Sequence, residues 1–420
     1  MNVHALRQTH VGAAVPRCLG CGAALVHTFV DLGSTPLANS YIEPGTPEPD
    51  PSYPLHARVC ERCLLVQVEP AVPPDAIFSD YAYFSSFSDS WLAHCRAYAG
   101  MAIERFALSA QSMVVEVASN DGYLLTNFVA AGIPCLGIEP AANVAECARK
   151  KGVPTEIAFF GAATARRLAT AGRKTDLLIA NNVLAHVPDI NDFVSGIGML
   201  LKDEGVCTIE FPHLLNLIRE LQFDTIYHEH FTYLSLLAVE RIFARHALRV
   251  FDVEELPTHG GSLRIYGCRS ESAREVSERV ARLRAKESDA LLDRPEGYAG
   301  FGERIDRIRR ELIWLLDAAQ GAGHKVAAYG AAAKGNTLLN YCGIGREQLA
   351  FVAERNPAKQ GRLLPGSRVP IVAPEAIFAE KPDYLLVLPW NLKDEIVEQN
   401  AAIRDWGGKF ITAIPEIRID

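Results

Sequence analysis

MVVEVASNDGYLL, residues 113–125, is the stretch that decides the fold of this chain. It begins as an apolar run of β-branched residues, which is typical of a strand buried on both faces of a parallel sheet. The run breaks at the small-residue segment 118–122, and an apolar helical pattern resumes at Tyr123. This order predicts a strand, a loop that a ligand can approach closely, and a helix whose first amides point at that ligand.

A second acidic position indicates a nucleoside cofactor. Glu139 ends the next apolar run, and an acid at the end of the second strand of a βαβ unit can hold both hydroxyls of a ribose. The loop lacks the GxGxxG of dinucleotide enzymes, because Ala118 and Asn120 occupy the two earlier glycine positions. An ordinary crossover with a polar turn is the alternative. Together with Glu116 inside the first strand, the pattern resembles the S-adenosylmethionine (SAM) site of Rossmann-like methyltransferases.

The composition is that of a soluble globular protein. Its 420 residues predict two or three domains, each large enough to bury a core. A net charge of −8 argues against a nucleic-acid footprint. No apolar run approaches the length of a membrane span, and the N-terminus lacks a signal-peptide core. We therefore expect a cytoplasmic protein that binds neither nucleic acid nor a membrane.

Four of the ten cysteines form two CxxC pairs, Cys18 with Cys21 and Cys60 with Cys63. In each pair a tight turn brings two thiolates to one side, and two such turns can close a tetrahedral zinc site. The proline-rich segment 43–54 between the pairs must then loop out. Accidental pairs or a disulfide couple are the alternative. Because cysteine fills all four positions, we predict a structural zinc ion that stabilises a small N-terminal module.

A segment rich in aromatic and hydroxyl groups, Phe78–Trp91, precedes a predicted helix over 91–106. It is consistent with a packed linker and, equally, with a wall of phenols and hydroxyls against a sugar or a base.

Residues 111–255 alternate strands with amphipathic helices, which predicts a doubly wound parallel sheet. Ligands of such sheets bind off the carboxyl ends of the strands. Asn181, Asn182 and His186 follow the predicted strand 176–180 and so belong to that edge. For His186, a hydrogen-bonded position in the core is the alternative.

A cluster of proton-transfer groups, Tyr227-His-Glu-His-Phe231, follows the cofactor sheet. The spacing is not the HExxH of zinc proteases, and no third metal ligand is near in the sequence. Imidazole titrates near neutral pH, and a neighbouring carboxylate can orient it and raise its basicity. His230 with Tyr227 and Glu229 therefore suits proton abstraction, and a purely structural cluster is the alternative.

Two later stretches carry candidate substrate ligands. The segment 257–266 predicts a turn that feeds an edge strand, on which Arg264 could meet an anionic ligand. A second α/β unit begins at Lys325, and its small-residue loop 330–337 with Lys334 predicts a diphosphate cradle. The GxxxxGK[ST] order of a P-loop is absent. Two Rossmann-like halves on either side of the Tyr227 cluster suit an enzyme with two substrates.

The order of these motifs resembles the SAM-dependent sugar C-methyltransferases, which act on nucleotide-activated 4-keto-deoxysugars. The most specific parts of the resemblance are the CxxC pairs, YHEHF (227–231) and AAKGNTLLN (332–340). The resemblance implies an α/β architecture with three domains. These are an N-terminal zinc module with four cysteine ligands (1–76), a central Rossmann-like SAM methyltransferase domain (77–255) and a C-terminal Rossmann-like α/β domain that binds the nucleotide sugar (256–420).

The resemblance also implies roles for individual residues. His230 would be the base, supported by Tyr227, Glu229 and His186. The implied SAM pocket consists of Glu116, Ser119, Asn120, Gly122, Glu139 and Asn182. Lys334 would hold the nucleotide diphosphate, and either Tyr81 or Tyr83 would reach the sugar. The full set of predicted substrate contacts is Tyr81, Tyr83, Ser86, His259, Arg264, Lys334 and Asn336.

In the implied reaction the base removes the C3 proton that the C4 ketone acidifies, and the enolate takes the methyl group of SAM. Tyr227 or His186 would donate a hydrogen bond to the oxyanion, and zinc takes no part. The alternatives are an O- or N-methyltransferase acting on a nucleotide sugar, a nicotinamide-dependent oxidoreductase and a zinc-ribbon interaction protein. We expect a nucleotide-linked keto-deoxysugar as partner, with thymidine diphosphate (dTDP) favoured over guanosine diphosphate (GDP), and a monomer or weak homodimer.

Overall fold

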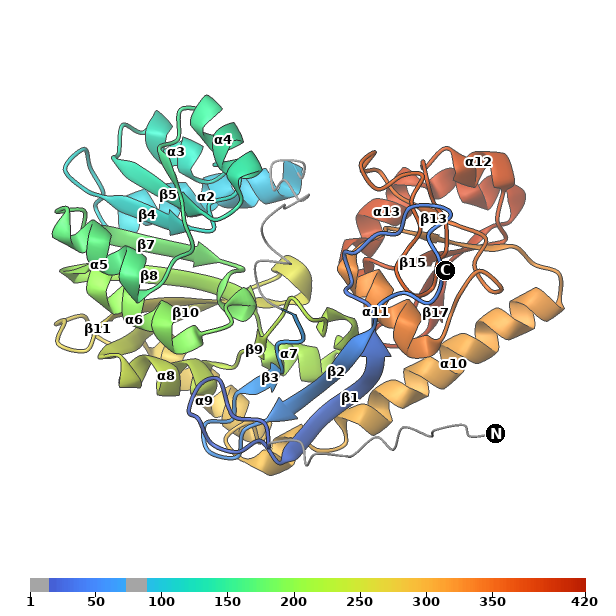
Figure 1. The fold of residues 1–420 in the computed structure, drawn as a ribbon, viewed down its shortest axis with the longest axis horizontal. Helices are drawn as coiled ribbons and strands as arrows, with labels where there is room; N and C mark the ends of the chain where they lie inside the picture. The colour runs from blue at the N-terminus through green and yellow to red at the C-terminus, as the bar shows by residue number, and fades with distance from the viewer. Residues whose placement is uncertain (1–14, 73–88) are drawn as a thin grey trace, which may run out of the picture.

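The computed structural model describes residues 15–72 and 89–420, which form three sheets (Figure 1). The predicted contacts Tyr81, Tyr83 and Ser86 lie outside the described residues. The expected α/β fold class is confirmed, with a cysteine module, a seven-stranded Rossmann-like sheet and a second α/β sheet.

The first sheet joins the N-terminal module to the predicted catalytic segment. Its order is β1 (His27–Thr35), β2 (Tyr53–Val59), β3 (Val66–Val68) and β9 (Thr232–Tyr233), and all its pairs are antiparallel. Gln67 pairs with Thr232, which directly follows YHEHF. The backbone that carries the predicted base is therefore hydrogen-bonded to the cysteine module.

The second sheet contains seven strands and holds the loop at 118–122. Its strand order is β10 (Leu248–Leu256), β11 (Ser262–Arg269), β8 (Leu201–Pro212), β7 (Thr175–Asn181), β4 (Val114–Val117), β5 (Cys135–Glu139) and β6 (Thr155–Ile157). β4 runs parallel to β5 and β7, as its apolar run predicts.

Alternate residues of β4 enter two cores. Val114 packs with α2 (Asp89–Arg105) and α3 (Leu125–Ala130). Val115 faces the core that α5 (Ala162–Thr170), α6 (Ile190–Leu200) and α8 (Leu236–Arg245) build. The remaining helices of this region are α4 (Ala142–Lys150), α7 (Leu214–Arg219) and α9 (Glu278–Asp289).

One prediction for this sheet is wrong. The segment from Ser262 does not form an edge strand, because β11 lies between β10 and β8 and is antiparallel to both. β11 also follows the predicted domain boundary at residues 255 and 256, yet it pairs within the seven-stranded sheet. The edge-strand prediction was wrong because the glycines that precede β11 suggested an exposed turn.

The third sheet repeats the parallel pattern. Its strand order is β14 (Ile371–Val372), β13 (Val352–Ala353), β12 (Val326–Tyr329), β15 (Tyr384–Val387), β16 (Lys409–Thr412) and β17 (Arg418–Ile419), and only the last pair is antiparallel. Its helices are α10 (Phe301–Gly321), α11 (Ala333–Cys342), α12 (Ala376–Glu380) and α13 (Lys393–Gln399).

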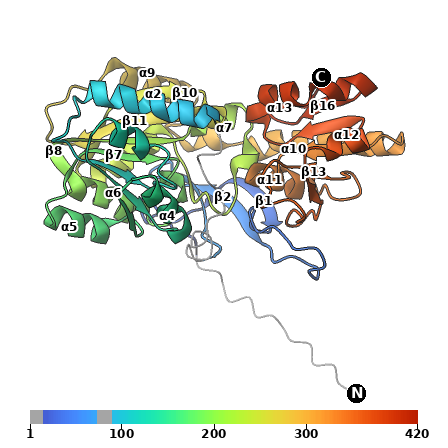
Figure 2. The ribbon, with the colours of Figure 1, turned by 90° about the horizontal axis from the view of Figure 1, so that it is seen from above.

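The two parallel sheets occupy separate lobes, with β1 and β2 between them (Figures 1 and 2). In Figure 1 the blue segment that follows β1 runs along the C-terminal lobe beside α11, and α10 extends from the neighbourhood of β1 along the same lobe. Within the described ranges, no helix combines the length and the apolar character that a membrane span needs.

Candidate active site

The four paired cysteines converge as the sequence predicts. Their sulfur atoms all lie within 4.8 Å of one another, and the Sγ atoms of Cys18 and Cys63 are 3.4 Å apart. Zinc–sulfur bonds of about 2.3 Å in a tetrahedron put sulfur atoms roughly 3.8 Å apart, so the four residues fit a zinc ion. Three of the four are buried. A fully cysteine-ligated site leaves no coordination position for a substrate, which is typical of structural zinc.

The loop after β4 has the strained backbone of a binding loop. Ala118 and Asn120 have φ values of 52° and 48°, and Gly122 has 77°. Positive φ is costly for alanine, and such residues cluster where a ligand must reach the backbone. The Glu139 carboxylate fixes the loop, because it accepts hydrogen bonds from the amides of Asn120 and Ala141, both at 2.9 Å.

Several buried polar atoms around this loop have no hydrogen-bond partner among the described residues. They are Glu116 Oε2, Ser119 Oγ, Asn181 Oδ1 and Asn182 Oδ1. Buried polar groups are rarely left unpaired, so these acceptors fit the ribose hydroxyls and the ammonium group of SAM. Burial, with Glu139 and Asp121 nearby, raises the pKa of Glu116 well above its usual value. A cationic ligand would relieve that electrostatic cost.

The predicted base, His230, is held in one tautomer. Its Nδ1 lies 2.8 Å from the carbonyl oxygen of Thr225, and its Nε2 lies 2.8 Å from the hydroxyl of Tyr227. A carbonyl can only accept, so Nδ1 carries the proton and Nε2 accepts from the tyrosine. Burial, aided by His186, Lys334 and His259, lowers the pKa of His230 well below its usual value. The ring is therefore neutral, as a base must be.

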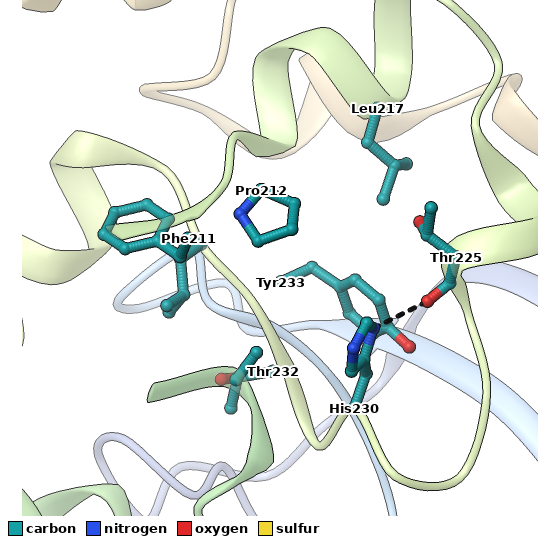
Figure 3. A pocket seen from close by; sticks show the side chains of 9 residues that line it. Phe211, Pro212, Leu217, Thr225, His230, Thr232 and Tyr233 are labelled. Atoms are coloured by element: carbon teal, nitrogen blue, oxygen red, sulfur yellow. Dashed lines mark hydrogen bonds between the residues drawn. The ribbon is translucent and has the colours of Figure 1, made fainter. Parts of the chain in front are cut away.

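A small cavity lies against His230, between the ring and an apolar wall (Figure 3). Its volume of about 10 Å³ holds at most one water molecule. Figure 3 shows Phe211, Pro212 and Leu217 on this wall, with Tyr233 beside the imidazole. The packing on this side limits the ring's movement.

The Glu229 carboxylate is bonded to Asn39 and not to the His230 ring. It accepts hydrogen bonds from Asn39 Nδ2 at 2.7 and 2.9 Å, and the Thr225 carbonyl takes the orienting position instead. The backbone carbonyl of Glu229 accepts from His186 Nδ1 at 2.8 Å. The His186 and His230 ring centroids are 4.5 Å apart, and burial lowers the pKa of His186 to about 4.

The loop after β12 repeats the clasp made by Glu139. The Glu354 carboxylate accepts hydrogen bonds from the amide of Ala331 at 2.8 Å and from that of Asn356 at 2.9 Å. The next helix, α11, begins at Ala333, and no side chain caps its first turn. Uncapped amides at a helix N-terminus suit a phosphate group.

Lys334 lies where α11 meets the catalytic segment. Its ammonium group is 3.2 Å from Asn391 Oδ1 and 4.7 Å from the centre of the Trp390 ring. Trp390 Nε1 in turn donates to Asp224 at 2.7 Å. Asp224 is fully buried, and burial raises its pKa to about 6 although Lys334 opposes the rise. Trp390, which lies beside Lys334, thus connects the C-terminal lobe with the segment that carries His230.

Three other predicted substrate contacts have protein partners. Arg264 forms ion pairs with Glu210 at 2.8 Å and with Glu254 at 3.0 Å, so it balances buried carboxylates rather than presenting an open anion site. Asn336 is 1% exposed, and its Nδ2 donates to the carbonyl of Ala38 beneath the cradle. His259 Nε2 lies 3.2 Å from Asn182 Nδ2, at the SAM side of the site.

A larger cavity of about 610 Å³ opens beside the second clasp. It is lined by Tyr329, Arg355, Gln360, Ala373, Pro374, Glu375, Phe378, Gln399 and Asn400. Most of these residues follow β12, β13 and β14, so the cavity lies at the carboxyl ends of parallel strands, where α/β sheets bind ligands.

Sequence reasoning missed several of these residues. Asp224 and Thr225 lie just before YHEHF. The Thr225 carbonyl fixes the tautomer of His230, but a backbone contact of this kind leaves no side-chain signal in the sequence. Asn39 stands in a segment that reads only as an irregular loop. Glu354 was detectable, since it ends the second strand of the second unit as Glu139 ends that of the first.

Three family models match the chain. One described as "C-methyltransferase C-terminal domain" matches residues 257–415, "Methyltransferase domain" matches 91–253, and "Putative zinc binding domain" matches 18–78. The C-methyltransferase NovU of Streptomyces niveus is 36% identical over 406 residues, which are 96% of this chain and 97% of that protein. Magnesium protoporphyrin IX methyltransferase of Synechocystis PCC 6803 with bound SAM has a TM-score of 0.36 at 14% identity, over 48% of this chain and 100% of that chain.

The fold and the site thus define a methyltransferase with a cysteine module at its N-terminus. The match to NovU along almost the whole length of both proteins places the chain more closely, and it belongs to the SAM-dependent C-methyltransferase family. SAM and zinc are accordingly its cofactors. The O- and N-methyltransferase, oxidoreductase and interaction-protein readings are set aside.

Proposed function

We propose that this enzyme methylates C3 of a nucleotide-diphosphate-linked 4-keto-6-deoxysugar, with His230 as the base that forms the enolate. The observation that carries the proposal is the tautomer of His230. Its Nδ1 proton is engaged by the Thr225 carbonyl, which leaves the Nε2 lone pair to take a proton. A ketone at C4 makes the C3 hydrogen acidic enough for such a base.

The Tyr227 hydroxyl has one proton, and in this mechanism it donates that proton to two acceptors in succession. In the resting site its hydroxyl donates to His230 Nε2. Once Nε2 takes the C3 proton it can no longer accept, so the tyrosine hydroxyl is released to donate to the developing oxygen anion at C4. His186 is unsuited to that donation, because its proton is on Nδ1 and bonded to the Glu229 carbonyl. The donor thus becomes available as the charge develops.

SAM, when bound, supplies a methyl group already activated by a positively charged sulfur. Glu139 and Asn182 would hold it from two sides, and the unpaired acceptors of Glu116 and Ser119 would bind its polar groups. The protein's own work is to bind the sugar, exclude water and move the C3 proton.

The nucleotide part would occupy the second lobe. The uncapped first turn of α11 and the Lys334 ammonium suit the diphosphate. The cavity of about 610 Å³ is large enough for a nucleoside, and Arg355, Gln360 and Asn400 offer it polar groups. These contacts support a nucleotide-linked sugar over a free sugar. We propose dTDP ahead of GDP as the nucleotide.

The test is mass spectrometry of the protein incubated in heavy water with SAM and a panel of dTDP- and GDP-linked 4-keto-6-deoxysugars. We expect one panel member to gain a single methyl group, and its unreacted fraction to gain deuterium at C3. Methyl transfer to an oxygen or nitrogen atom, or to carbon without C3 exchange, would contradict the proposal.

A further inference from the structure

Residues 36–50, which we name the strap, tie the N-terminal module to the catalytic segment and the C-terminal lobe. Ile42 and Leu363 exchange two backbone hydrogen bonds, at 2.9 and 2.8 Å. Asp50 pairs with Arg368 and accepts from the Gly366 amide at 2.8 Å. The Tyr41 hydroxyl donates to the carbonyl of Ala331 in the cradle at 2.6 Å. The strap is therefore fixed at both ends and along its length.

Asn39 is the strap residue that reaches the catalytic segment. Its Nδ2 lies 2.7 Å from Oε1 and 2.9 Å from Oε2 of Glu229. A carboxylate accepts only, so the amide must present its NH₂ group to Glu229. The Tyr41 hydroxyl, whose proton goes to the Ala331 carbonyl, lies 3.3 Å from Asn39 Oδ1.

Glu229 depends on this amide. It is 6% exposed, and its carboxylate accepts hydrogen bonds from Asn39. A buried carboxylate without donors is costly, and it tends to take up a proton. Burial raises the pKa of Glu229, and the Asn39 hydrogen bonds oppose that rise.

We propose that Asn39 is a positioning residue of the methyl-transfer reaction, contributed by the zinc-binding module, which holds the Glu229 carboxylate ionised and in place beside the base. The inference rests on the proposed function. Residue 229 is held at both ends, by Asn39 through its carboxylate and by His186 through its carbonyl. His230 follows directly in the chain, so this double anchor sets the position of the base.

Most of the titratable side chains around Glu229 are held neutral by burial. On the strap, Tyr41 stays neutral because burial, with Glu354 and Glu229, raises its pKa. His186 and His230 are neutral as well, because burial lowers the pKa of each. Tyr227 and His228 lie on the same segment as Glu229, and burial lowers the pKa of His228. Glu229 is the member of this set whose carboxylate accepts hydrogen bonds from Asn39.

The sharpest variant is Asn39→Asp, which keeps the shape and donates a hydrogen bond only when protonated. We expect the ratio of its kcat to that of the natural enzyme to fall at least about tenfold between pH 5 and 8, because two carboxylates then face each other. A purely structural role predicts a ratio that does not depend on pH. A ratio constant within twofold would overturn the proposal.

Asn39→Ala and Asp50→Asn complete the design. Asn39→Ala should lower kcat at least about tenfold and leave KM for the sugar within about threefold. Asp50→Asn weakens the strap's anchor without touching Glu229, so its kcat should stay within about twofold at every pH. Equal losses in both variants, with unchanged circular dichroism, would assign the effect to the strap as a whole and contradict the role of Asn39.

The two proposals fail separately. If the natural enzyme transfers methyl groups without exchanging C3 hydrogen, the enolate mechanism is wrong, and the pH ratio of Asn39→Asp still reports on Glu229. If C3 exchange occurs at the natural rate in both Asn39 variants, the enolate mechanism stands and the role of Asn39 is refuted.

Discussion

The loops after β4 and β12 share one clasp and differ in charge. In each, a glutamate at the end of the neighbouring strand accepts from a loop amide and from the amide two residues beyond itself, Glu139 in one lobe and Glu354 in the other. Around the first clasp lie Glu116 and Asp121, whereas two lysines, Lys334 and Lys359, lie near the second. The same backbone device thus serves opposite electrostatic environments.

Under the proposed function, the difference explains how one architecture can bind two unlike ligands. SAM carries a positive sulfur and an ammonium group, and the first lobe offers it carboxylates and unpaired acceptors. A nucleotide diphosphate is an anion, and the second lobe offers ammonium groups and uncapped helix amides. The clasp shapes the loop, and the residues around it select the ligand. His230 lies on the segment whose next strand, β9, pairs with the cysteine module.

Removing the zinc ion should destabilise the module that lies between the lobes, and we expect it to cause the largest loss of activity. Structural zinc contributes folding free energy directly, and β3 of the zinc module pairs with β9 beside the catalytic segment. We expect Cys60→Ser, or chelation of the zinc, to lower methyl transfer on the order of 100-fold or more, since small displacements of a base cost that much. Zinc content and turnover are measured together. Cys147→Ser, a cysteine outside the cluster, is the control, and full turnover without zinc would refute the connection.

The sequence allowed Glu139 to be predicted more fully than its surroundings, whereas Glu354 was missed. Glu139 and the strands 135–139 and 176–180 follow from apolar runs and a terminal acid, and the cysteine cluster follows from spacing alone. The partners of Glu229 and Arg264 could not be predicted, because Asn39 lies in an irregular loop and Glu210 on another strand. Local pattern identifies which side chains carry chemistry, whereas long-range packing decides which of them meet.

Matched substitutions of the two clasp acids test whether the lobes bind separately. Glu139→Gln should weaken SAM binding roughly 10- to 100-fold, as expected for a lost charge-assisted hydrogen bond, and leave nucleotide-sugar binding unchanged. Glu354→Gln should do the reverse. Isothermal titration calorimetry with each ligand measures both constants, and each variant is the other's control. If either substitution weakened both ligands equally, the division of labour would be disproved.

Asp224→Asn tests the contact between the catalytic segment and the C-terminal lobe, and among these variants we expect it to have the smallest effect. Its effect is on the free energy of unfolding. The folded-state pKa of about 6 lies above the ordinary value of 3.8, so the stabilising contribution is present below pH 4 and lost as pH rises through 6. The variant should therefore unfold with a free energy higher by up to about 3 kcal/mol at pH 8 and unchanged at pH 3.5. Urea titration at both pH values measures this. An equal gain in the free energy of unfolding at pH 3.5 and pH 8 would contradict the account that Asp224 is ionised and buried at pH 8.

The most direct measurement of the central claim is the exchange of the C3 hydrogen in heavy water without SAM, compared between the natural enzyme and His230→Asn. The account predicts that the natural enzyme exchanges C3 and that the variant does so at least about 100-fold more slowly while binding both ligands normally. Exchange at the natural rate in a folded His230→Asn variant would show that another group is the base.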